Sequence, residues 1–376
     1  MNGIYYYLIA FAIIWILVAI FHEKLSNHGV ELNFPVIMWR TQKLRGLISK
    51  ISNISPTFWR WYMNVGIVVA FGAMIFITWT IVSTLPSVFE TPSVSIVIPG
   101  VDVPGSPIYV PFVYGLIALA TVLVVHEFSH GIQAVGEKIS IKSIGLLLFA
   151  IIPGAFVEPD EDELKEAKRT SRLRVYAAGS IANMTLALIA LVLLSLVSVG
   201  IPHYFHEDGI AIDRIVSDSP SEGILKEGMV LEAIDNHHIN GSDDYSKIIT
   251  SFSPGDNVTV KTDQGTYHVT LGKNPSNESR GFFGIQANKH FELIDDSLGP
   301  LPWILFELAE LFEWIAMLNL GIGLFNLLPL KPLDGGYMVE ILLSYKLSEE
   351  HYKPIVNALS GVMAMIIIVS ILAGFI

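Results

Sequence analysis

The stretch Thr121–Gly131, TVLVVHEFSHG, places two histidines and a glutamate inside a segment that is otherwise apolar enough to cross a membrane. An ionisable residue in hydrocarbon costs roughly 2.5 to 3.5 kcal/mol on insertion scales, so this cluster indicates side chains that the protein uses. Positions four apart share one face of an α-helix. His126 and His130 can therefore present two imidazoles to one Zn²⁺, with Glu127 projecting toward a metal-bound water. The alternative is a polar patch that only hydrogen-bonds a neighbouring helix.

The composition is that of a membrane protein, with 52% hydrophobic and only 15% charged residues. The chain contains no cysteine, which excludes disulfides and thiolate ligands and leaves His, Asp and Glu as the possible metal ligands. Its net charge of −12 is concentrated between residues 203 and 300, so nucleic-acid binding is disfavoured. Residues 3–21 have no basic region and no cleavage site before them, so we expect a retained first span rather than a signal peptide.

Six stretches are long and apolar enough to span a lipid bilayer, which takes roughly 20 residues of helix. They are residues 3–21, 63–85, 112–135, 174–199, 302–328 and 354–376. The loop over 22–61 carries six Lys and Arg residues, whereas the loop over 86–111 carries none, so the first loop is expected in the cytoplasm. Alternating from there places the acidic block outside. We therefore expect an integral protein of the plasma membrane.

Between the third and fourth spans, residues 140–157 read SIKSIGLLLFAIIPGAFV, an apolar stretch interrupted by Gly145, Pro153 and Gly154. It is too short to cross the membrane and return as a helix. A re-entrant β-like hairpin fits, because such a backbone is tolerated at membrane depth where protein or a water-filled cavity satisfies its amides. An interfacial loop is the alternative. The acidic run 158–166 that follows is expected to be a solvated segment.

Residues 209–288 show the short alternating strands and the Gly, Asp and Asn turns of a small β-rich domain. The pattern predicts a helix over 243–252 with Ser242 as its N-cap, and strands over 211–216, 230–234, 257–262 and 267–271. The block resembles a bacterial-type PDZ domain through IVSDSP at 215–220, GMVLEAID at 228–235, SPGDNV at 253–258 and DQG at 263–265. PDZ domains bind an extended peptide as an added strand, so the resemblance implies a peptide ligand. A domain that only blocks access to the membrane is the alternative.

A catalytic zinc site usually has three protein ligands, so a third must join the two histidines. The best candidate is Asp334, in the Pro- and Gly-rich stretch NLLPLKPLDGG at 326–336. His126 lies about 21 Å along a span that descends from outside, in the cytoplasmic third of a core about 30 Å thick. Asp334 ends the descending fifth span, and Asn183 lies in the first turns of the ascending fourth span. All three are therefore expected at a similar depth.

These elements together resemble the site-2 protease family of intramembrane metalloproteases. That family pairs His-Glu-x-x-His with a later Asn-x-x-Pro-x-x-Pro-x-Asp-Gly element and a Gly-x-x-x-Asn element between them. The matching residues are Asn326, Pro329, Pro332, Asp334 and Gly335 for the former, and Gly179 and Asn183 for the latter. The likeness covers residues 112–340 and implies one Zn²⁺ per chain, bound by His126, His130 and Asp334. It also implies regulated intramembrane proteolysis, the hydrolysis of peptide bonds within or near the transmembrane segments of single-span substrates.

Roles for the residues around this centre follow from the chemistry and the resemblance. Glu127 is expected to take the proton of the attacking water and pass it to the leaving amide nitrogen. Asn326 is the candidate donor to the oxyanion, with capping of the broken helix as the alternative. Asn183 is a candidate for substrate positioning or for helix–helix hydrogen bonding. Residues 140–157 could accept the unwound substrate as an added strand, and the other candidate positioning residues are Gly179, Gly145, Pro153 and Gly154.

We therefore expect a polytopic α-helical membrane protein of about six spans, with a re-entrant β-like hairpin and an inserted PDZ-like domain. The predicted parts are two N-terminal spans with a basic loop (1–110), the first part of the catalytic core (111–200), the extracytoplasmic PDZ-like domain (203–295), the second part of the core (301–340) and a C-terminal span (341–376). The family motifs do not explain the N-terminal part. Two other functions stay open: a metal-ion transporter or sensor that uses the same His/Asp site, and a non-catalytic membrane scaffold.

Overall fold

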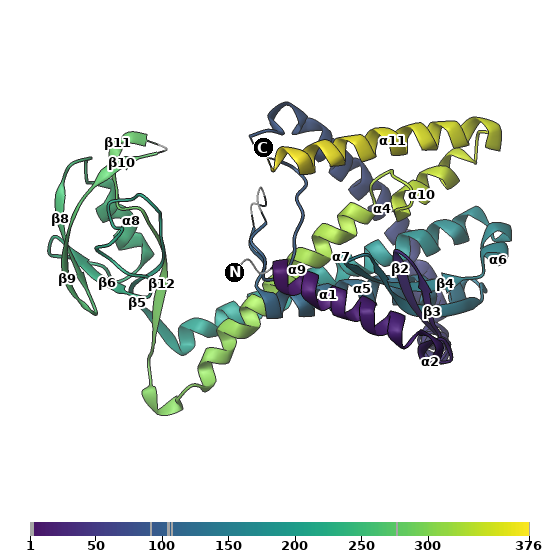
Figure 1. Ribbon diagram of the computed structural model, residues 1–376, viewed down its shortest axis with the longest axis horizontal. Coiled ribbons are helices and arrows are strands. Elements are labelled where there is room, and N and C mark those ends of the chain that lie inside the picture. The colour runs from purple at the N-terminus through teal and green to yellow at the C-terminus, as the bar shows by residue number, and fades with distance from the viewer. Residues whose placement is uncertain (1–3, 91, 104–105, 107, 276, 376) are drawn as a thin grey trace. The chain divides into compact units, whose positions relative to one another are not determined.

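The computed structural model describes residues 4–90, 92–103, 106, 108–275 and 277–375 (Figure 1). These residues form two units. One contains the long apolar helices and a four-stranded sheet, and the other spans Ser195–Glu307. The chain enters the second unit from helix α7 (Arg169–Gly200) and leaves it through helix α9 (Ile304–Asn326).

Five helices in the described part of the chain are long and apolar enough to cross a membrane, so the protein is a polytopic α-helical membrane protein. They are α4 (Pro56–Ser83), α5 (Phe112–Gly136), α7, α9 and α11 (Glu349–Ala373). The first expected span is the shorter apolar helix α1 (Ile4–Ile20), so a count of six spans is not confirmed. Gly3 and Ile376, at the ends of two expected spans, lie outside the described residues.

Helix α4 begins before the residue at which the hydropathy pattern predicts its span to start. The Ser55 hydroxyl accepts the Phe58 N–H at 3.4 Å, and Pro56 occupies the first turn. Both are features of a helix N-terminus, since they satisfy or remove a backbone donor that has no partner within the helix. The capping residue, rather than the edge of the apolar stretch, therefore determines where α4 begins.

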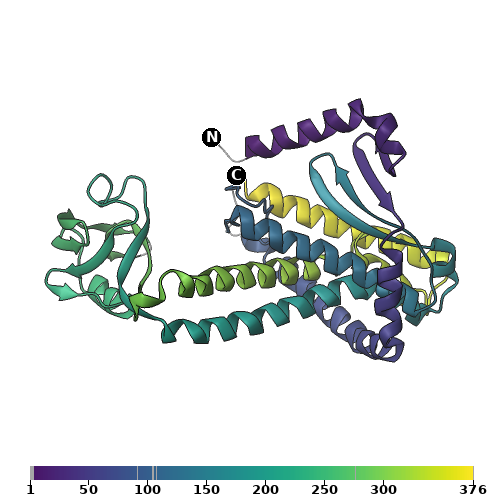
Figure 2. The same cartoon turned by 90° about the horizontal axis from the view of Figure 1, so that it is seen from below.

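A four-stranded antiparallel sheet has the strand order β1–β2–β3–β4. Its strands are β1 (Val30–Asn33), β2 (Val36–Thr41), β3 (Ile141–Phe149) and β4 (Ile152–Pro159). The predicted β-like hairpin over 140–157 is present as β3 and β4, and the basic loop after α1 supplies the other two strands. Helix α1 meets the tips of both hairpins (Figure 2), where Trp15 Nε1 donates to the Ala150 carbonyl at 2.7 Å and its ring packs edge-on against Phe34.

Short helices join this sheet to the long ones: α2 (His22–Ser26), α3 (Arg45–Ile54) and α6 (Glu161–Glu166). Helix α3 lies against α5, where Ile48 is fully buried and the Ser52 hydroxyl donates to the Ile132 carbonyl at 2.8 Å. The acidic run over 158–166 is more ordered than expected for a solvated segment. It ends β4 and then forms α6, which Asp160 caps by accepting two backbone N–H groups.

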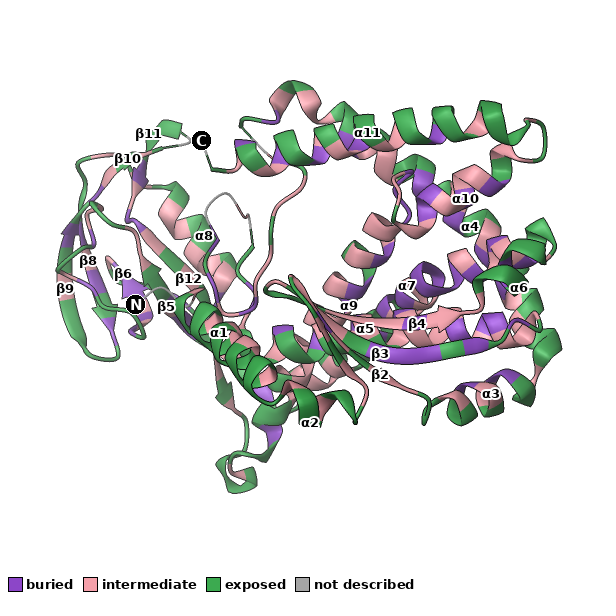
Figure 3. Cartoon of the chain, turned by 45° about the vertical axis from the view of Figure 1, so that its right-hand side comes forward, coloured by how far each residue is buried: buried purple, intermediate pink, exposed green. Residues whose placement is uncertain are grey.

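The second unit is a β-rich fold around helix α8 (Ser242–Thr250). Its main sheet has the order β12–β5–β6–β8–β9, with β7 paired to β6, and β10 pairs with β11. The strands are β5 (Phe205–Ile215), β6 (Val230–Ile234), β7 (His237–His238), β8 (Asn257–Thr262), β9 (Gly265–Thr270), β10 (Gly272–Asn274), β11 (Asn277–Phe282) and β12 (Ile285–Leu293). Buried and exposed residues alternate along β8 (Figure 3), as in a sheet that covers a core on one face.

The predicted strands of this unit correspond to β5, β6, β8 and β9, whereas β7 and β10 to β12 were not predicted. The predicted N-cap of α8 is wrong. Gly241 precedes the helix and Ser242 is its first residue. The Asp244 carboxylate accepts both the backbone and the side-chain N–H of Asn240, which starts the turn one residue earlier.

Helix α10 (Asp334–Leu343) is separate from α9, so Asp334 opens a short helix rather than ending the fifth span as expected. Two glycines allow this return of the chain. A Cβ on Gly335 would lie 2.2 Å from the Leu327 carbonyl oxygen, and one on Gly336 would lie 2.5 Å from the Lys331 nitrogen. The remaining described elements are 3-10 turns at Leu85–Ser87, Ile201–His203, Asp296–Leu298 and Leu301–Trp303.

Candidate active site

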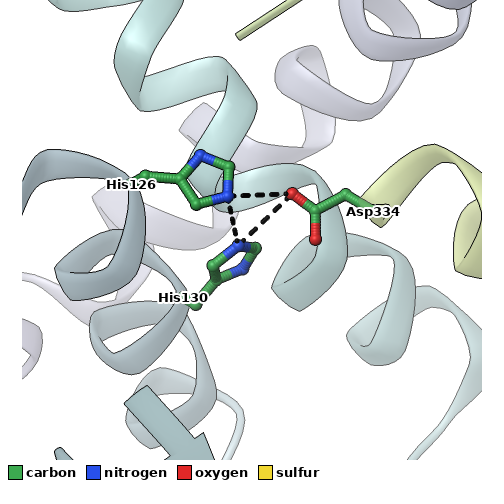
Figure 4. Close-up of side chains that lie close together, drawn as sticks. All are labelled: His126, His130 and Asp334. Carbon is green, nitrogen blue, oxygen red and sulfur yellow. Dashed lines mark hydrogen bonds and ion pairs between the residues drawn. The ribbon is translucent and has the colours of Figure 1, made fainter. Parts of the chain in front are cut away.

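Three polar side chains meet inside the helical unit (Figure 4). His126 and His130 come from α5, and Asp334 is the first residue of α10. The two Nε2 atoms are 3.1 Å apart, and each lies 3.3 Å from Asp334 Oδ2. The side chains are nearly buried, with 11% of His126 and 13% of each of the others exposed. The structure thus brings together the three residues that the sequence groups as ligands.

The spacing of these three atoms fits a tetrahedral metal ion. Ligand atoms about 2.0–2.1 Å from Zn²⁺ lie about 3.3 Å from one another in a tetrahedron, close to the 3.1 and 3.3 Å observed. Asp334 Oδ2 is buried without a hydrogen-bond partner, and the two Nε2 atoms face each other. Lone pairs in this arrangement repel unless a cation lies between them. Two imidazoles and one carboxylate are also a donor set of catalytic zinc sites.

Helix α7 orients both imidazole rings. His130 Nδ1 lies 2.7 Å from the Val175 carbonyl oxygen, so this nitrogen carries the proton and Nε2 keeps its lone pair. His126 Nδ1 lies 3.3 Å from the side-chain amide of Asn183, a fully buried residue whose Oδ1 has no partner. A half-turn of this amide gives His126 Nδ1–H an acceptor and leaves Nε2 directed at Asp334.

Gly179 lets α7 approach the two rings. A Cβ at this position would lie 2.5 Å from His130 Nε2 and 2.7 Å from two atoms of the His126 ring. Real Cβ contacts are essentially never shorter than 3.0 Å, so any side chain here would displace a ring or the helix. The structure places Gly179 against the rings, and its expected role in substrate positioning stays a prediction.

Glu127 lies between α5 and the edge of the sheet. Its Oε2 accepts the backbone N–H of Val157 in β4 at 3.0 Å. Since β4 pairs with β3 on its other side, this N–H points away from the sheet. Alternate residues of a strand point their amides the same way, so the amide of Ala155 faces the same side as that of Val157. The open edge of β4 therefore runs past the candidate general base.

Asn326 is the last residue of α9, and its side-chain amide donates to the Ile322 carbonyl at 3.1 Å. This is the helix-capping bond that the sequence leaves open as the alternative to an oxyanion donor. An amide has two N–H donors, so the capping bond leaves one for a second acceptor.

The other candidate positioning residues belong to the sheet. Gly145 in β3 pairs with Arg40, and a Cβ there would lie 2.0 Å from the Trp39 carbonyl oxygen, so the two hairpins can approach only at a glycine. Pro153 and Gly154 are in β4. Proline has no N–H to pair and is tolerated on an edge strand, which is the position of β4 among the described strands.

Residues 114–368, more than half of the chain, match the family model described as peptidase family M50. The chain belongs to peptidase family M50. The matched segment of this M50 chain contains His126, Glu127, His130 and Asp334, together with Gly179 on α7. The sheet of the M50 chain is only partly inside the match, since β1 and β2 precede residue 114.

Curated proteins similar to this M50 chain include an uncharacterized protein of Methanocaldococcus jannaschii, 30% identical over 60% of this chain and 56% of that protein. A membrane-bound transcription factor site-2 protease homolog of Arabidopsis thaliana is 27% identical over 42% of this chain and 30% of its own length. A chloroplastic membrane metalloprotease of the same plant is 26% identical over 60% of this chain and 68% of its own length. The chain thus spans about a third to two thirds of the length of these relatives.

Among solved structures, the PDZ domain of an SdrC-like protein from Listeria innocua is similar to this M50 chain. The sequences are 24% identical, and the match covers 22% of this chain and 97% of that domain, with a TM-score of 0.21.

A buried ion pair that was not predicted from the sequence joins α5, which carries both histidines, to α7 in this M50 chain. Glu137, at the end of α5, is only 6% exposed in its side chain and lies 2.9 Å from Arg174 Nη1 on α7. The Ser171 hydroxyl donates to the same carboxylate at 2.5 Å, and Arg174 also donates to Asn64 Oδ1 on α4 at 2.8 and 2.9 Å. Arg174 directly precedes Val175, whose carbonyl holds His130. The only sign of this pair in the sequence is an acidic residue, Glu137, just after one expected span and basic residues at the start of the next.

A second missed cluster joins all four strands of the sheet in this M50 chain. Arg40 in β2 forms ion pairs with Glu31 in β1, at 3.2 Å, and with Glu158 in β4. Its guanidinium also donates to the Ser143 hydroxyl in β3 at 3.0 Å and lies 5.3 Å above the Phe156 ring. The hydrogen bond from Ser143 and the charge of Arg40 hold the pKa of Glu158 below its usual value, against the effect of burial.

Proposed function

We propose that this chain is a membrane-embedded zinc endopeptidase that hydrolyses peptide bonds within or near the transmembrane segments of single-span membrane proteins. The observation that supports this most strongly is the convergence of His126, His130 and Asp334 beside Glu127. Residues of this kind are costly within apolar helices unless they are used. Membership of peptidase family M50 supports the same reaction.

The residues around the centre divide the chemistry of amide hydrolysis among them. A Zn²⁺ held by the three ligands would supply a Lewis acid for the scissile carbonyl and acidify the attacking water. Glu127 would accept the proton that this water loses and deliver it to the departing nitrogen. The free N–H of Asn326 is our candidate donor to the oxyanion. Val175 keeps the His130 ring in the tautomer that leaves its Nε2 lone pair free, and Asn183 would do the same for His126 with its amide turned so that Oδ1 faces Nδ1.

A substrate helix keeps its carbonyls hydrogen-bonded, so it must unwind before an amide can be attacked. We propose that the unwound segment pairs with the open edge of β4, where Val157 already donates an N–H to Glu127. Replacing Ala155 with proline removes an outward N–H while the amides that face β3 stay intact. This variant should lose cleavage but keep zinc, whereas Ala155→Gly, which keeps the N–H, should stay active. Equal activity of the two variants would exclude strand addition at this edge.

We also propose an orientation and a location. The Lys- and Arg-rich loops support an orientation with the metal-ligand residues toward the cytoplasm and the β-rich unit outside, and the location we propose is the plasma membrane. The proposed domain boundaries follow the predicted parts given above. The β-rich unit, which resembles a PDZ domain in sequence, is proposed to bind an extended peptide.

The test of the reaction is the variant Glu127→Gln, purified in detergent with a model single-span substrate. We expect it to lose turnover and to retain zinc, because glutamine keeps the size of the side chain but cannot carry the proton. Asp334→Asn should lose both. If the chain is a scaffold, neither substitution should affect partner binding, and the native chain should show no cleavage. A metal transporter would retain ion flux in Glu127→Gln, and that result would contradict the peptidase proposal.

A further inference from the structure

A cavity of about 740 Å³ lies among β4, α6, α7, α10 and α11, outside the metal centre itself. Its volume is within the range of about 300–1,000 Å³ that is typical of ligand pockets. Three tyrosines from three helices line it: Tyr176, Tyr337 and Tyr352. The rings of Tyr176 and Tyr337 stack with their centroids 4.8 Å apart. The wall of the cavity therefore carries aromatic rings beside its charged groups.

Chain connectivity places this cavity next to the metal centre. Tyr337 lies one helical turn beyond Asp334 on α10. Tyr176 directly follows Val175, whose carbonyl accepts the His130 ring N–H. Glu158, also in the wall, directly follows the β4 residue whose amide binds Glu127. Each of the three elements β4, α7 and α10 thus carries one residue at the candidate active site and a residue nearby in the sequence whose side chain lines the cavity.

Among the described residues, one cation in the cavity wall has no ion-pair partner. The three lysines in the wall are paired: Lys165 with Glu161, Lys331 with Glu340, and Lys353 with Glu349. Glu158 is paired with Arg40, which lies outside the cavity.

Arg172 differs from these lysines. It has no ion pair within the described part of the chain, and its Nε is buried without a hydrogen-bond partner. A buried donor on a charged group costs free energy when it is unsatisfied. A guanidinium is best satisfied by a carboxylate, which accepts two parallel hydrogen bonds from it.

We propose that this cavity binds a carboxylate of the substrate chain through Arg172, with the tyrosine rings packing on the neighbouring peptide. The inference rests on the proposed peptidase function and adds a substrate specificity to it. The substrate would carry an acidic group in the part of its chain, beside the scissile bond, that lies toward the basic run 165–174 of the protein. Two sources supply such a group. One is an Asp or Glu side chain in the substrate segment that flanks the membrane, and the other is the terminal carboxylate that cleavage creates.

The experiment measures binding on the full-length Glu127→Gln chain in detergent, so that it does not depend on turnover. The probes are fluorescent peptides in two matched pairs: one with an internal Glu or Gln and an amidated terminus, the other with a free or an amidated terminus. The binding site variant is Arg172→Gln. Its control is Arg169→Gln, one turn earlier on α7, where the arginine donates to the Ser344 hydroxyl and does not line the cavity.

We expect the chain with Arg172 to bind one acidic probe about 10- to 100-fold more tightly than its neutral partner, as for a hydrogen bond to a charged group. Arg172→Gln should abolish this preference and Arg169→Gln should keep it. Preference for the Glu probe identifies the side chain as the source, and preference for the free terminus identifies the product. Arg172→Lys, which keeps the charge but not the fork, should retain a weaker preference and serves if Arg172→Gln does not fold.

Two results would overturn the proposal: no preference for either acidic probe, or equal weakening of acidic and neutral probes by Arg172→Gln. The proposed peptidase function fails separately, by absence of cleavage in the native chain, and that result leaves the probe measurement intact.

Discussion

Replacing Gly179 with alanine tests whether the contact between α7 and the imidazoles holds the centre together. The added Cβ would lie 2.5 Å from His130 Nε2, whereas ordinary contact begins near 3.4 Å. Either the ring nitrogen retreats by about 0.9 Å or α7 moves outward and weakens the Val175 bond. Metal–ligand distances tolerate only about 0.2 Å. Overpacking of this kind typically costs about 1–3 kcal/mol of stability, and where this cost falls on the metal-bound state it lowers metal affinity about 5- to 150-fold.

The assay is a competition titration of zinc against a fluorescent chelator, followed by cleavage of a model single-span substrate. Gly321→Ala in α9 is the matched control, because a Cβ there meets nothing within 4 Å. Alanine is favoured over glycine in a helix by about 1 kcal/mol, so the control should be neutral or stabilised. Because both substitutions raise helix propensity equally, a loss of zinc affinity seen only in Gly179→Ala comes from the steric contact. Native zinc affinity in Gly179→Ala would refute the reasoning.

Three further changes test the shell around the centre. Asn183→Ala should weaken zinc binding by about 10- to 100-fold in the same titration, because the His126 ring loses its orienting partner. Ile48→Ala should lower the free energy of unfolding by about 2–5 kcal/mol in a denaturant titration, since this α3 side chain is fully buried against α5 and the sheet. The lowered pKa of Glu158 means that its contribution to stability is present above the unfolded pKa near 4.5 and is lost as pH falls through the lower folded pKa. The protection of the β4 amides against hydrogen exchange, measured relative to the intrinsic rate at each pH, should therefore fall in acid, and in Glu158→Gln it should be low at every pH.

The grouping of His126, His130 and Asp334 was predictable, but by two different routes. His126 and His130 are one helical turn apart, so their spacing suggests a shared site, whereas Asp334 was added from its expected depth in the membrane and from its motif. The four-stranded sheet was not predictable in the same way, because Arg40 pairs with Gly145 across about a hundred residues and no pattern within either segment encodes the partner. Ser242 shows why helix boundaries are harder to predict than helices. Serine is a common capping residue, yet Ser242 is the first residue of α8, whose start is fixed by the hydrogen bond from the Asn240 side chain to the Asp244 carboxylate.

The N-terminal part, which the family motifs leave unexplained, is joined to the reactive centre by a short chain of contacts. Arg40 in β2 binds the carboxylate of Glu158, and the preceding residue, Val157, donates its backbone N–H to Glu127. The Arg40–Glu158 ion pair, the peptide unit between Glu158 and Val157, and the hydrogen bond from Val157 to Glu127 thus connect the hairpin of β1 and β2 to the candidate general base. A strand held by Arg40 cannot shift along its neighbour without breaking contacts to three other strands. The position of the Glu127 carboxylate therefore depends on residues that precede the matched family segment, and the hairpin of β1 and β2 is part of the catalytic unit in a physical sense.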